Sequence, residues 1–254
     1  MENKIICGDA SQVLKGFPCE CVDMVLTSPP YDDLRTYGQD EKFTYDKFTA
    51  VADELIRVLK PGGVIVWVVG DRVVKGSKTG SSFRHALYFM EHGLNLNDTM
   101  IWLKTNPMPV VRQPRYSPCY EFMHVFSKGK PKTFNPIMRQ TKCGGQGYHS
   151  TAKKMGGENG RRELNYTVNK ETVDYNVWKI AVAQNKTGHP AVFPYELAEK
   201  HVLSWSNEGD IVLDPFVGSG TTPLACVKNN RCYIGIDISD EYCKMSCDRL
   251  KNCH

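Results

Sequence analysis

Short apolar runs that stop abruptly at polar residues or glycine restrict most strongly how this chain can fold. Each run is rich in β-branched residues and too short for a helix, which is typical of a buried strand. Helical periodicity separates most of the runs, most clearly from Asp46 to Lys60, and Pro61-Gly62-Gly63 stops that pattern. Strands that alternate with helices predict an α/β fold, with a mostly parallel sheet and helices on both faces. The runs are residues 5–7, 22–26, 64–69, 99–103, 121–126, 211–213 and 232–236.

One pair of strands breaks the alternation. Residues 99–103 and 121–126 are joined by a proline-rich loop without a helical pattern, so we expect them to pair antiparallel. Between Ser127 and Lys186 the periodicity fades, and this stretch is predicted to have the least regular structure. Further helices are predicted at residues 82–92, 195–204, 222–228 and 240–250.

Positive charge is concentrated in the same stretch. Residues 128–186 contain twelve Lys or Arg against four Asp or Glu, an excess of eight. Because the whole chain has a net charge of +4, the remainder has a net charge of −4. A basic segment on a slightly acidic body indicates a surface that faces a polyanion, although a solvated lysine-rich loop has the same composition.

The overall composition limits the classes of protein to which this chain can belong. No apolar stretch reaches the roughly 20 residues that a membrane span requires, and residues 1–10 lack the layout of a secretory signal, so we expect a cytoplasmic protein. The ten cysteines are scattered and are expected to be reduced thiols. Cys243, Cys247, Cys253 and His254 cluster near the end, but they do not form the paired knuckles of a structural zinc site, and no metal is expected.

The residues best suited to binding and catalysis lie in two loops that follow predicted strands. Thr27-Ser28-Pro29-Pro30-Tyr31 offers a hydroxyl, a proline carbonyl and an aromatic ring in a stiff turn. Asp214 to Thr222 offers glycine-spaced backbone and a carboxylate, which suits a cationic or zwitterionic nucleoside cofactor. This second loop has Pro223 where a dinucleotide-binding loop has its third glycine. We expect the residues at strand ends to lie along one rim of the sheet: Asp9, Ser28, Asp71, Asp214 and Asp237.

With these motifs, the chain resembles the amino-group DNA methyltransferases that use S-adenosylmethionine, in the permuted (beta) class where the catalytic motif precedes the cofactor motif. The resemblance implies a Rossmann-like sheet of seven strands with one reversed. It also implies a catalytic part at residues 1–127, a basic target-recognition insertion at 128–187, and a cofactor-binding part at 188–254. Further matching motifs are Gly8-Asp9-Ala10, Leu59-Lys60-Pro61-Gly62-Gly63, Ile101-Trp102-Leu103-Lys104 and His189-Pro190-Ala191-Val192-Phe193-Pro194.

The resemblance also assigns roles to single residues. Asp9 is expected to meet the adenine of the cofactor, Asp237 its ribose hydroxyls, and the segment from His189 its methionine end. The expected cofactor-binding residues are Asp9, Thr27, His189, Pro190, Asp214, Phe216, Gly218, Ser219, Gly220, Thr221 and Asp237.

The catalytic residues are expected to be Ser28, Pro29, Pro30 and Tyr31. An exocyclic amino group on a base is a poor nucleophile because its lone pair is delocalised into the ring. Acceptors on its hydrogens, here the Ser28 hydroxyl and the Pro29 carbonyl, would aim the lone pair at the methyl donor. Tyr31 would stack on the flipped-out base. Family members with Ser at position 28 typically methylate cytosine at its 4-amino group, whereas those with Asp methylate adenine at its 6-amino group.

Double-stranded DNA is the expected partner, and a restriction endonuclease acting separately is a candidate second one. The protein is expected to be a monomer or a homodimer. The candidate DNA-binding residues are Arg112, Arg115, Tyr116, Arg139, Lys142, Lys153, Lys154, Arg161 and Arg162.

Other functions remain open at this point. Methylation at carbon 5 of cytosine would use a cysteine after a proline, and Cys19 and Cys119 both follow one. A nucleic-acid-binding protein without catalysis, or a Rossmann oxidoreductase, would share much of the predicted fold.

Overall fold

The structure, a computed structural model, describes residues 2–30, 43–107, 114–153, 161–183 and 194–251. Of residues 150–153 and 161–164 it describes only the backbone. The chain forms two compact units, residues 1–135 with 176–254, and residues 136–175. No helix within the described ranges is both long enough and apolar enough to cross a membrane.

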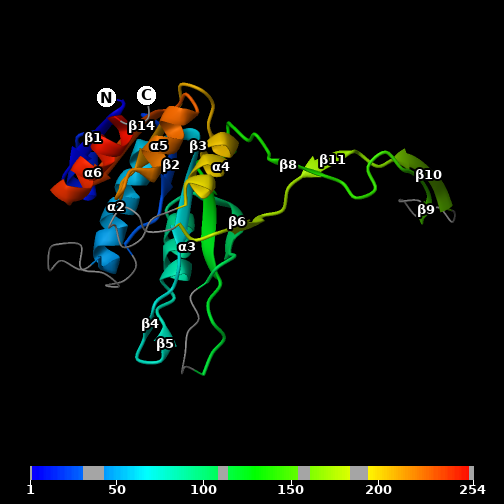
Figure 1. Cartoon of the computed structure of the whole chain (residues 1–254), viewed down its shortest axis with the longest axis horizontal. Coiled ribbons are helices and arrows are strands. Elements are labelled where there is room, and N and C mark those ends of the chain that lie inside the picture. Colours follow the sequence, from blue (N-terminus) through cyan, green and yellow to red (C-terminus); the bar gives the residue numbers. More distant parts are fainter. Residues whose placement is uncertain (1, 31–42, 108–113, 154–160, 184–193, 252–254) are drawn as a thin grey trace. The chain divides into compact units, whose positions relative to one another are not determined.

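The larger unit is built on a sheet of eight strands, counted over the described residues (Figure 1). Only β7 runs antiparallel to its neighbours in this sheet, so the predicted mostly parallel α/β fold with one reversed strand is confirmed. The order across the sheet is β1 (Lys4–Cys7), β14 (Cys232–Asp237), β13 (Ile211–Asp214), β2 (Val22–Thr27), β3 (Leu59–Val69), β7 (Tyr120–Ser127), β6 (Asn95–Lys104) and β12 (Val177–Ile180).

The strand β12 raises the number of strands from the predicted seven to eight. It pairs parallel with β6, with Trp178 opposite Trp102, and the Trp102 indole N–H donates to the Ile180 carbonyl at 2.9 Å. Its four residues lie in the stretch that was predicted to have the least regular structure. A strand this short carries no readable periodicity, and pairing with β6 supplies the hydrogen bonds that make it a strand.

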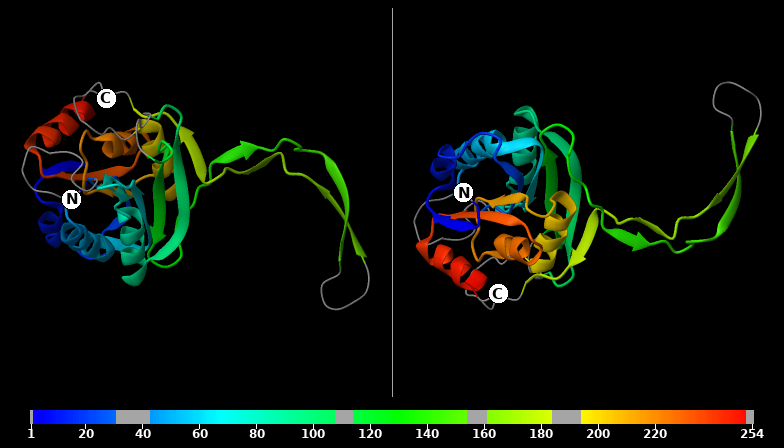
Figure 2. Two further views of the ribbon diagram at one scale, coloured as in Figure 1. Left: turned by 90° about the horizontal axis from the view of Figure 1, so that it is seen from below. Right: turned by 90° about the horizontal axis from the view of Figure 1, so that it is seen from above.

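Helices cover both faces of the sheet. Figure 2 shows α1, α2 and α3 on one face and α4, α5 and α6 on the other. Every predicted helix is found within two residues of its expected ends, and only the six-residue α1 was not separately predicted. The bounds are α1 Ala10–Lys15, α2 Tyr45–Val58, α3 Ser81–Glu91, α4 Tyr195–Trp205, α5 Thr221–Lys228 and α6 Asp240–Lys251.

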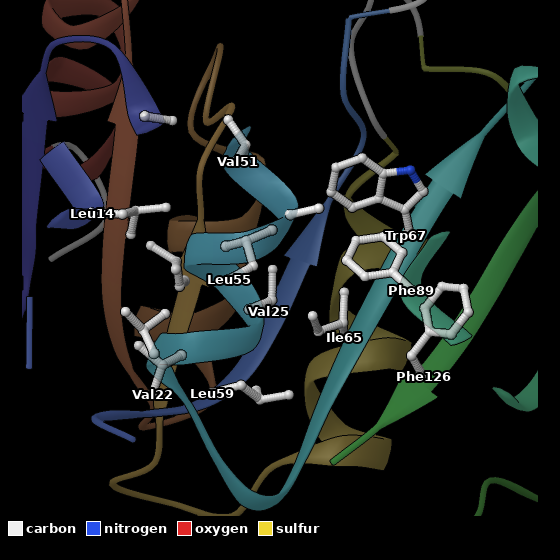
Figure 3. Packing of buried hydrophobic residues seen from close by; sticks show 14 of the residues in the cluster. Leu14, Val22, Val25, Val51, Leu55, Leu59, Ile65, Trp67, Phe89 and Phe126 are labelled. Carbon is white, nitrogen blue, oxygen red and sulfur yellow. The ribbon is translucent and has the colours of Figure 1, made fainter. Parts of the chain in front are cut away.

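A hydrophobic core between α1–α3 and the sheet holds the central strands in place (Figure 3). The Thr44 side chain caps α2 by accepting from the Lys47 amide, and the helix then buries Phe48, Val51, Ala52, Leu55 and Val58 along one face. Phe48 packs against Trp67 of β3 with ring centroids 5.7 Å apart. This packing holds α2 against β3, which is the neighbour of β2 in the sheet.

The smaller unit is a set of paired antiparallel strands. In it β8 (Met138–Gln140) pairs with β11 (Glu171–Val173), and β9 (Gly147–Lys153) pairs with β10 (Arg161–Thr167). The unit, residues 136–175, lies within the predicted insertion at 128–187. The sequence predicted this stretch to have the weakest signal for regular structure. Its polar ribbons form by backbone pairing, without the apolar alternation that marks a half-buried strand.

Candidate active site at the carboxyl ends of the strands

Five polar residues from distant parts of the sequence meet at one edge of the sheet. The strands β1, β14, β13, β2 and β3 run parallel, so their carboxyl ends share that edge. The predicted rim is therefore confirmed by the strand order. From one side of the sheet to the other, the residues are Asp9, Asp237, Asp214, Ser28 and Asp71.

A hydrogen bond joins the two predicted loops. The chain leaves β13 toward β14 but leaves β2 toward β3 in the opposite direction, which makes the boundary of β13 and β2 the switch point where such sheets bind ligands. Across this boundary the Thr27 hydroxyl donates to the Asp214 carboxylate at 2.6 Å. Residues 187 positions apart in the chain are thereby held together at the centre of the rim.

The Asp214 carboxylate is buried, with only 5% of the residue exposed. Burial raises the pKa of this carboxyl to about 6, and hydrogen bonds from Thr27, Thr222 and the Phe216 amide only partly offset that effect. A buried carboxylate is most stable as the anion when a cationic group lies beside it. The site therefore favours a ligand with a positive charge close to Asp214.

The loop after β13 turns tightly around Asp237. The Gly218 amide donates to one Asp237 carboxylate oxygen at 2.9 Å, and the Ser239 amide donates to the other at 2.9 Å. Burial raises the pKa of Asp237 as well. Asp9 lies next along the rim, where its carboxylate caps α1 by accepting from the Gln12 amide at 3.2 Å.

Two residues of α6 support this loop and were not predicted. The buried Ser246 hydroxyl donates to the Gly218 carbonyl at 2.9 Å. The Arg249 guanidinium donates to the Ser219 carbonyl and to the Thr221 hydroxyl, both at 3.0 Å. Nothing in the sequence marks these residues, because they lie in an ordinary amphipathic helix and only the tertiary structure brings that helix to the loop.

Gly220 offers a direct test of the loop. It has φ 78°, and a Cβ atom there would lie 2.7 Å from the Ser246 hydroxyl oxygen. We expect Gly220→Ala to displace the loop and weaken cofactor binding at least tenfold, measured by calorimetric titration. Gly209 is the matched control, because it has φ 81° but open space around it. Gly209→Ala should cost only the left-handed conformation, about 1–2 kcal/mol of stability, and leave the cofactor affinity unchanged; equal affinities for the two variants would contradict this role of the loop.

The loop after β2, which was predicted to be catalytic, is described as far as Pro30. Pro29 is buried, whereas Ser28 and Pro30 are half-buried. Tyr31, His189 and Pro190 lie outside the described residues. The roles predicted for these residues therefore remain predictions.

The candidate DNA-binding residues lie in different environments. Arg115 donates to the Gly76 carbonyl at 2.6 Å, and Tyr116 is fully exposed. In the smaller unit, Arg139 lies over the Tyr175 ring, 4.0 Å from its centroid, and Lys142 is exposed. Arg112 and Lys154 lie outside the described residues, as do the side chains of Lys153, Arg161 and Arg162, although the backbone places Arg161 opposite Lys153.

The two cysteines that follow a proline do not resemble catalytic nucleophiles. Cys19 is exposed and precedes β2, at the opposite end of that strand from Thr27. Cys119 is half-buried and precedes β7 rather than ending a strand. Among the cysteines weighed for zinc, Cys243 is buried on α6, while Cys253 and His254 lie outside the described residues. In the residues that are described, no group of three or more His, Cys, Asp or Glu is placed to hold a metal ion.

Known proteins are similar to this chain in both sequence and architecture. The N6/N4 methyltransferase family, described as DNA methylase, matches residues 22–248. The orphan methyltransferase M.BamHII of Bacillus amyloliquefaciens is 48% identical over 91% of this chain and 89% of its own. The type II methyltransferase M.HpaI of Haemophilus parainfluenzae is 32% identical over 98% and 74%.

Solved structures agree with this match. The complex of M1.HpyAVI with SAM has a TM-score of 0.65 and 26% identity over 97% of this chain and 98% of that one. The cytosine-N4-specific PvuII DNA methyltransferase has a TM-score of 0.70 at 21% identity, covering 98% and 86%, and so shows the shared fold. Since the family match spans residues 22–248 and M.BamHII is similar over 89% of its own length, this chain belongs to the N6/N4 DNA methylase family.

Proposed function

We propose that this protein transfers a methyl group from S-adenosylmethionine to the 4-amino group of a cytosine flipped out of duplex DNA. The observation that carries the proposal is the hydrogen bond between Thr27 and Asp214. It joins the end of the catalytic strand to the end of the cofactor strand at the switch point of the sheet. An amine acceptor and a methyl donor bound on either side of that bond would be neighbours.

The residues of the rim fit S-adenosylmethionine. Its amino acid moiety carries an ammonium group, which matches the buried Asp214 carboxylate with its raised pKa. Asp237 is the residue for the ribose hydroxyls, and Asp9 is the residue for the adenine. Gly220 lets the loop pack closely against Ser246 of α6, where a Cβ atom would lie 2.7 Å from the hydroxyl oxygen. The remaining proposed cofactor residues are Thr27, His189, Pro190, Phe216, Gly218, Ser219 and Thr221.

When bound, S-adenosylmethionine supplies a sulfonium methyl group that is electrophilic. The protein's own contribution is to position and polarise the amine. The Ser28 hydroxyl and the Pro29 carbonyl accept hydrogen bonds from the amino group, which makes its nitrogen more tetrahedral and frees its lone pair. Pro29 and Pro30 hold the turn rigid, and Tyr31 stacks on the extruded base.

Ser28 supports cytosine as the base, because Ser at this position is the habit of the family's cytosine enzymes. Adenine at its 6-amino group is the alternative substrate, since both groups are planar aryl amines that need the same treatment. The smaller unit supports duplex DNA as the partner. Its β9–β10 ribbon carries Arg161 opposite Lys153, and the major groove of B-DNA admits a two-stranded ribbon.

The identity of the methylated base is the decisive measurement. The protein is incubated with methyl-labelled S-adenosylmethionine and mixed-sequence duplex DNA, and the DNA is digested to nucleosides. We expect the label in N4-methylcytosine. Label only in N6-methyladenine would refute the choice of cytosine but keep the enzyme class, and no label in DNA would favour a catalytically silent DNA-binding protein.

A further inference from the structure

A small hairpin beside the catalytic strand carries positive charge that the methylation chemistry does not use. In it β4 (Val73–Val74) pairs with β5 (Ser77–Lys78), and we call residues 72–80 the basic hairpin. It follows directly on β3, whose Trp67 lies opposite Thr27 of the catalytic strand. The base of the hairpin and Ser28 therefore follow paired positions on neighbouring strands, at the same edge of the sheet.

Contacts at both ends hold the basic hairpin in place. At its base, the Asp71 carboxylate accepts from the amide and the hydroxyl of Ser82, at 3.0 and 2.9 Å. At its tip, Arg115 donates to the Gly76 carbonyl at 2.6 Å. A hairpin with such short strands would not persist alone in water, so these contacts account for its order. Figure 1 shows β4 and β5 projecting beside the segment that leads into β7.

The charge of this region is of one sign. Residues 72–80 and 114–119 together contain four Lys or Arg and no Asp or Glu. Asp71, the neighbouring acid, is engaged at the start of α3. Lys75 and Lys78 are exposed, and the neighbouring Tyr116 is fully exposed. Cations and an aromatic ring at one end of a sheet suit a nucleic acid backbone.

The turn of the basic hairpin is also an unusual place for a lysine. Lys75 and Gly76 have φ of 47° and 83°, as a type I′ turn requires at both central positions. Asn or Gly is preferred at the first of these positions, because other side chains are strained there. The hairpin therefore has a cation at its tip where a better turn-forming residue would serve the fold.

We propose that the basic hairpin is a second DNA-contacting element, separate from the smaller unit, in which Lys75 and Lys78 bind phosphates of the duplex beside the flipped base. This proposal rests on the proposed function. A flipped base leaves the stack only if the backbone around it is held, and the hairpin lies at the edge of the sheet where that backbone must pass.

The test is a double variant that removes both charges without disturbing the fold. Lys75→Asn creates the Asn-Gly turn that a type I′ hairpin prefers, so the thermal stability of the variant should be equal or higher. Lys78→Gln removes the second charge. The control is Lys15→Gln with Lys251→Gln, which makes the same change in net charge at exposed sites near the ends of α1 and α6.

We expect the hairpin variant to bind a mixed-sequence duplex more weakly and to lower the slope of log affinity against log salt by about two, roughly 0.9 for each phosphate that the protein no longer neutralises. Its KM for DNA should rise while its affinity for S-adenosylmethionine stays unchanged. An unchanged slope and KM would overturn the proposal, as would an equal change in the control. Failure of the wild type to methylate DNA would instead refute the proposed function, and failure of the wild type to bind DNA would refute both.

Discussion

Replacing Asp214 with Asn is expected to stabilise the cofactor-free protein at neutral pH while weakening S-adenosylmethionine binding and methylation. Burial raises the pKa of Asp214 from 3.8 to about 6. The folded state therefore binds the Asp214 proton more tightly than the unfolded state does. Folding stability must then fall as the pH rises from about 4 to about 6, and the full cost, on the order of 3 kcal/mol, is present above both values.

Asn keeps the shape of the side chain and the acceptor oxygen for Thr27 but has no proton to lose. The Asp214→Asn variant therefore does not lose folding stability by burying an ionised carboxylate. Urea unfolding should show the variant to be more stable than the wild type at pH 7.5, with the difference shrinking toward pH 4. The cofactor affinity, measured by calorimetric titration, should drop roughly 10- to 100-fold because a charged hydrogen-bond acceptor is lost.

Asp248→Asn is the control for both measurements, since that carboxylate is exposed and pairs with Lys251. It should change neither the stability at pH 7.5 nor the cofactor affinity by much. A variant Asp214→Asn that is less stable than the wild type at pH 7.5, or that binds the cofactor equally well, would contradict the proposed role of the buried carboxylate.

Ser28→Ala is expected to lower the rate of methyl transfer about 10²- to 10³-fold, the usual effect of losing one group that stabilises the transition state. The reason is that the amine nitrogen loses an acceptor that reshapes it, while the binding surface for DNA is unchanged. Single-turnover kinetics with labelled cofactor would measure the step directly, because product release otherwise masks chemistry.

The affinity of Ser28→Ala for S-adenosylmethionine should equal that of the wild type, which separates a chemical role from a folding defect. Ser28→Thr retains the hydroxyl and should recover part of the rate. Ser204→Ala, whose hydroxyl donates to the Lys200 carbonyl within α4 at 2.8 Å, should behave as the wild type does in both measurements. A rate for Ser28→Ala within a few-fold of the wild type would exclude Ser28 from the transition state.

Local pattern was sufficient to predict much of the fold. The strands of the central sheet are buried, so each reads as an apolar run, and the helices between them show their own periodicity. The loops after β2 and β13 could be predicted as a site because parallel strands bring their carboxyl ends to one edge. The order of these loops along the chain was visible in the sequence alone.

Short or polar elements could not be predicted in this way. The strand β12 has four residues, and β4 and β5 have two each, which is too few for a pattern to be recognised. The ribbons of the smaller unit are polar, and their strands form through backbone pairing that leaves no mark in hydrophobicity.

The sequence by itself determined seven strands of the sheet, the two loops and the family to which they point. Burial of a strand and the conformation of a turn both depend on residues that are neighbours in the chain, so a local pattern reveals them. The tertiary structure alone decided the geometry and electrostatics of the candidate site. It placed Thr27 on Asp214, raised the pKa of that carboxyl by burying it, and brought Ser246 and Arg249 of α6 beneath the loop. These effects depend on distances between residues far apart in the chain, which no local pattern encodes.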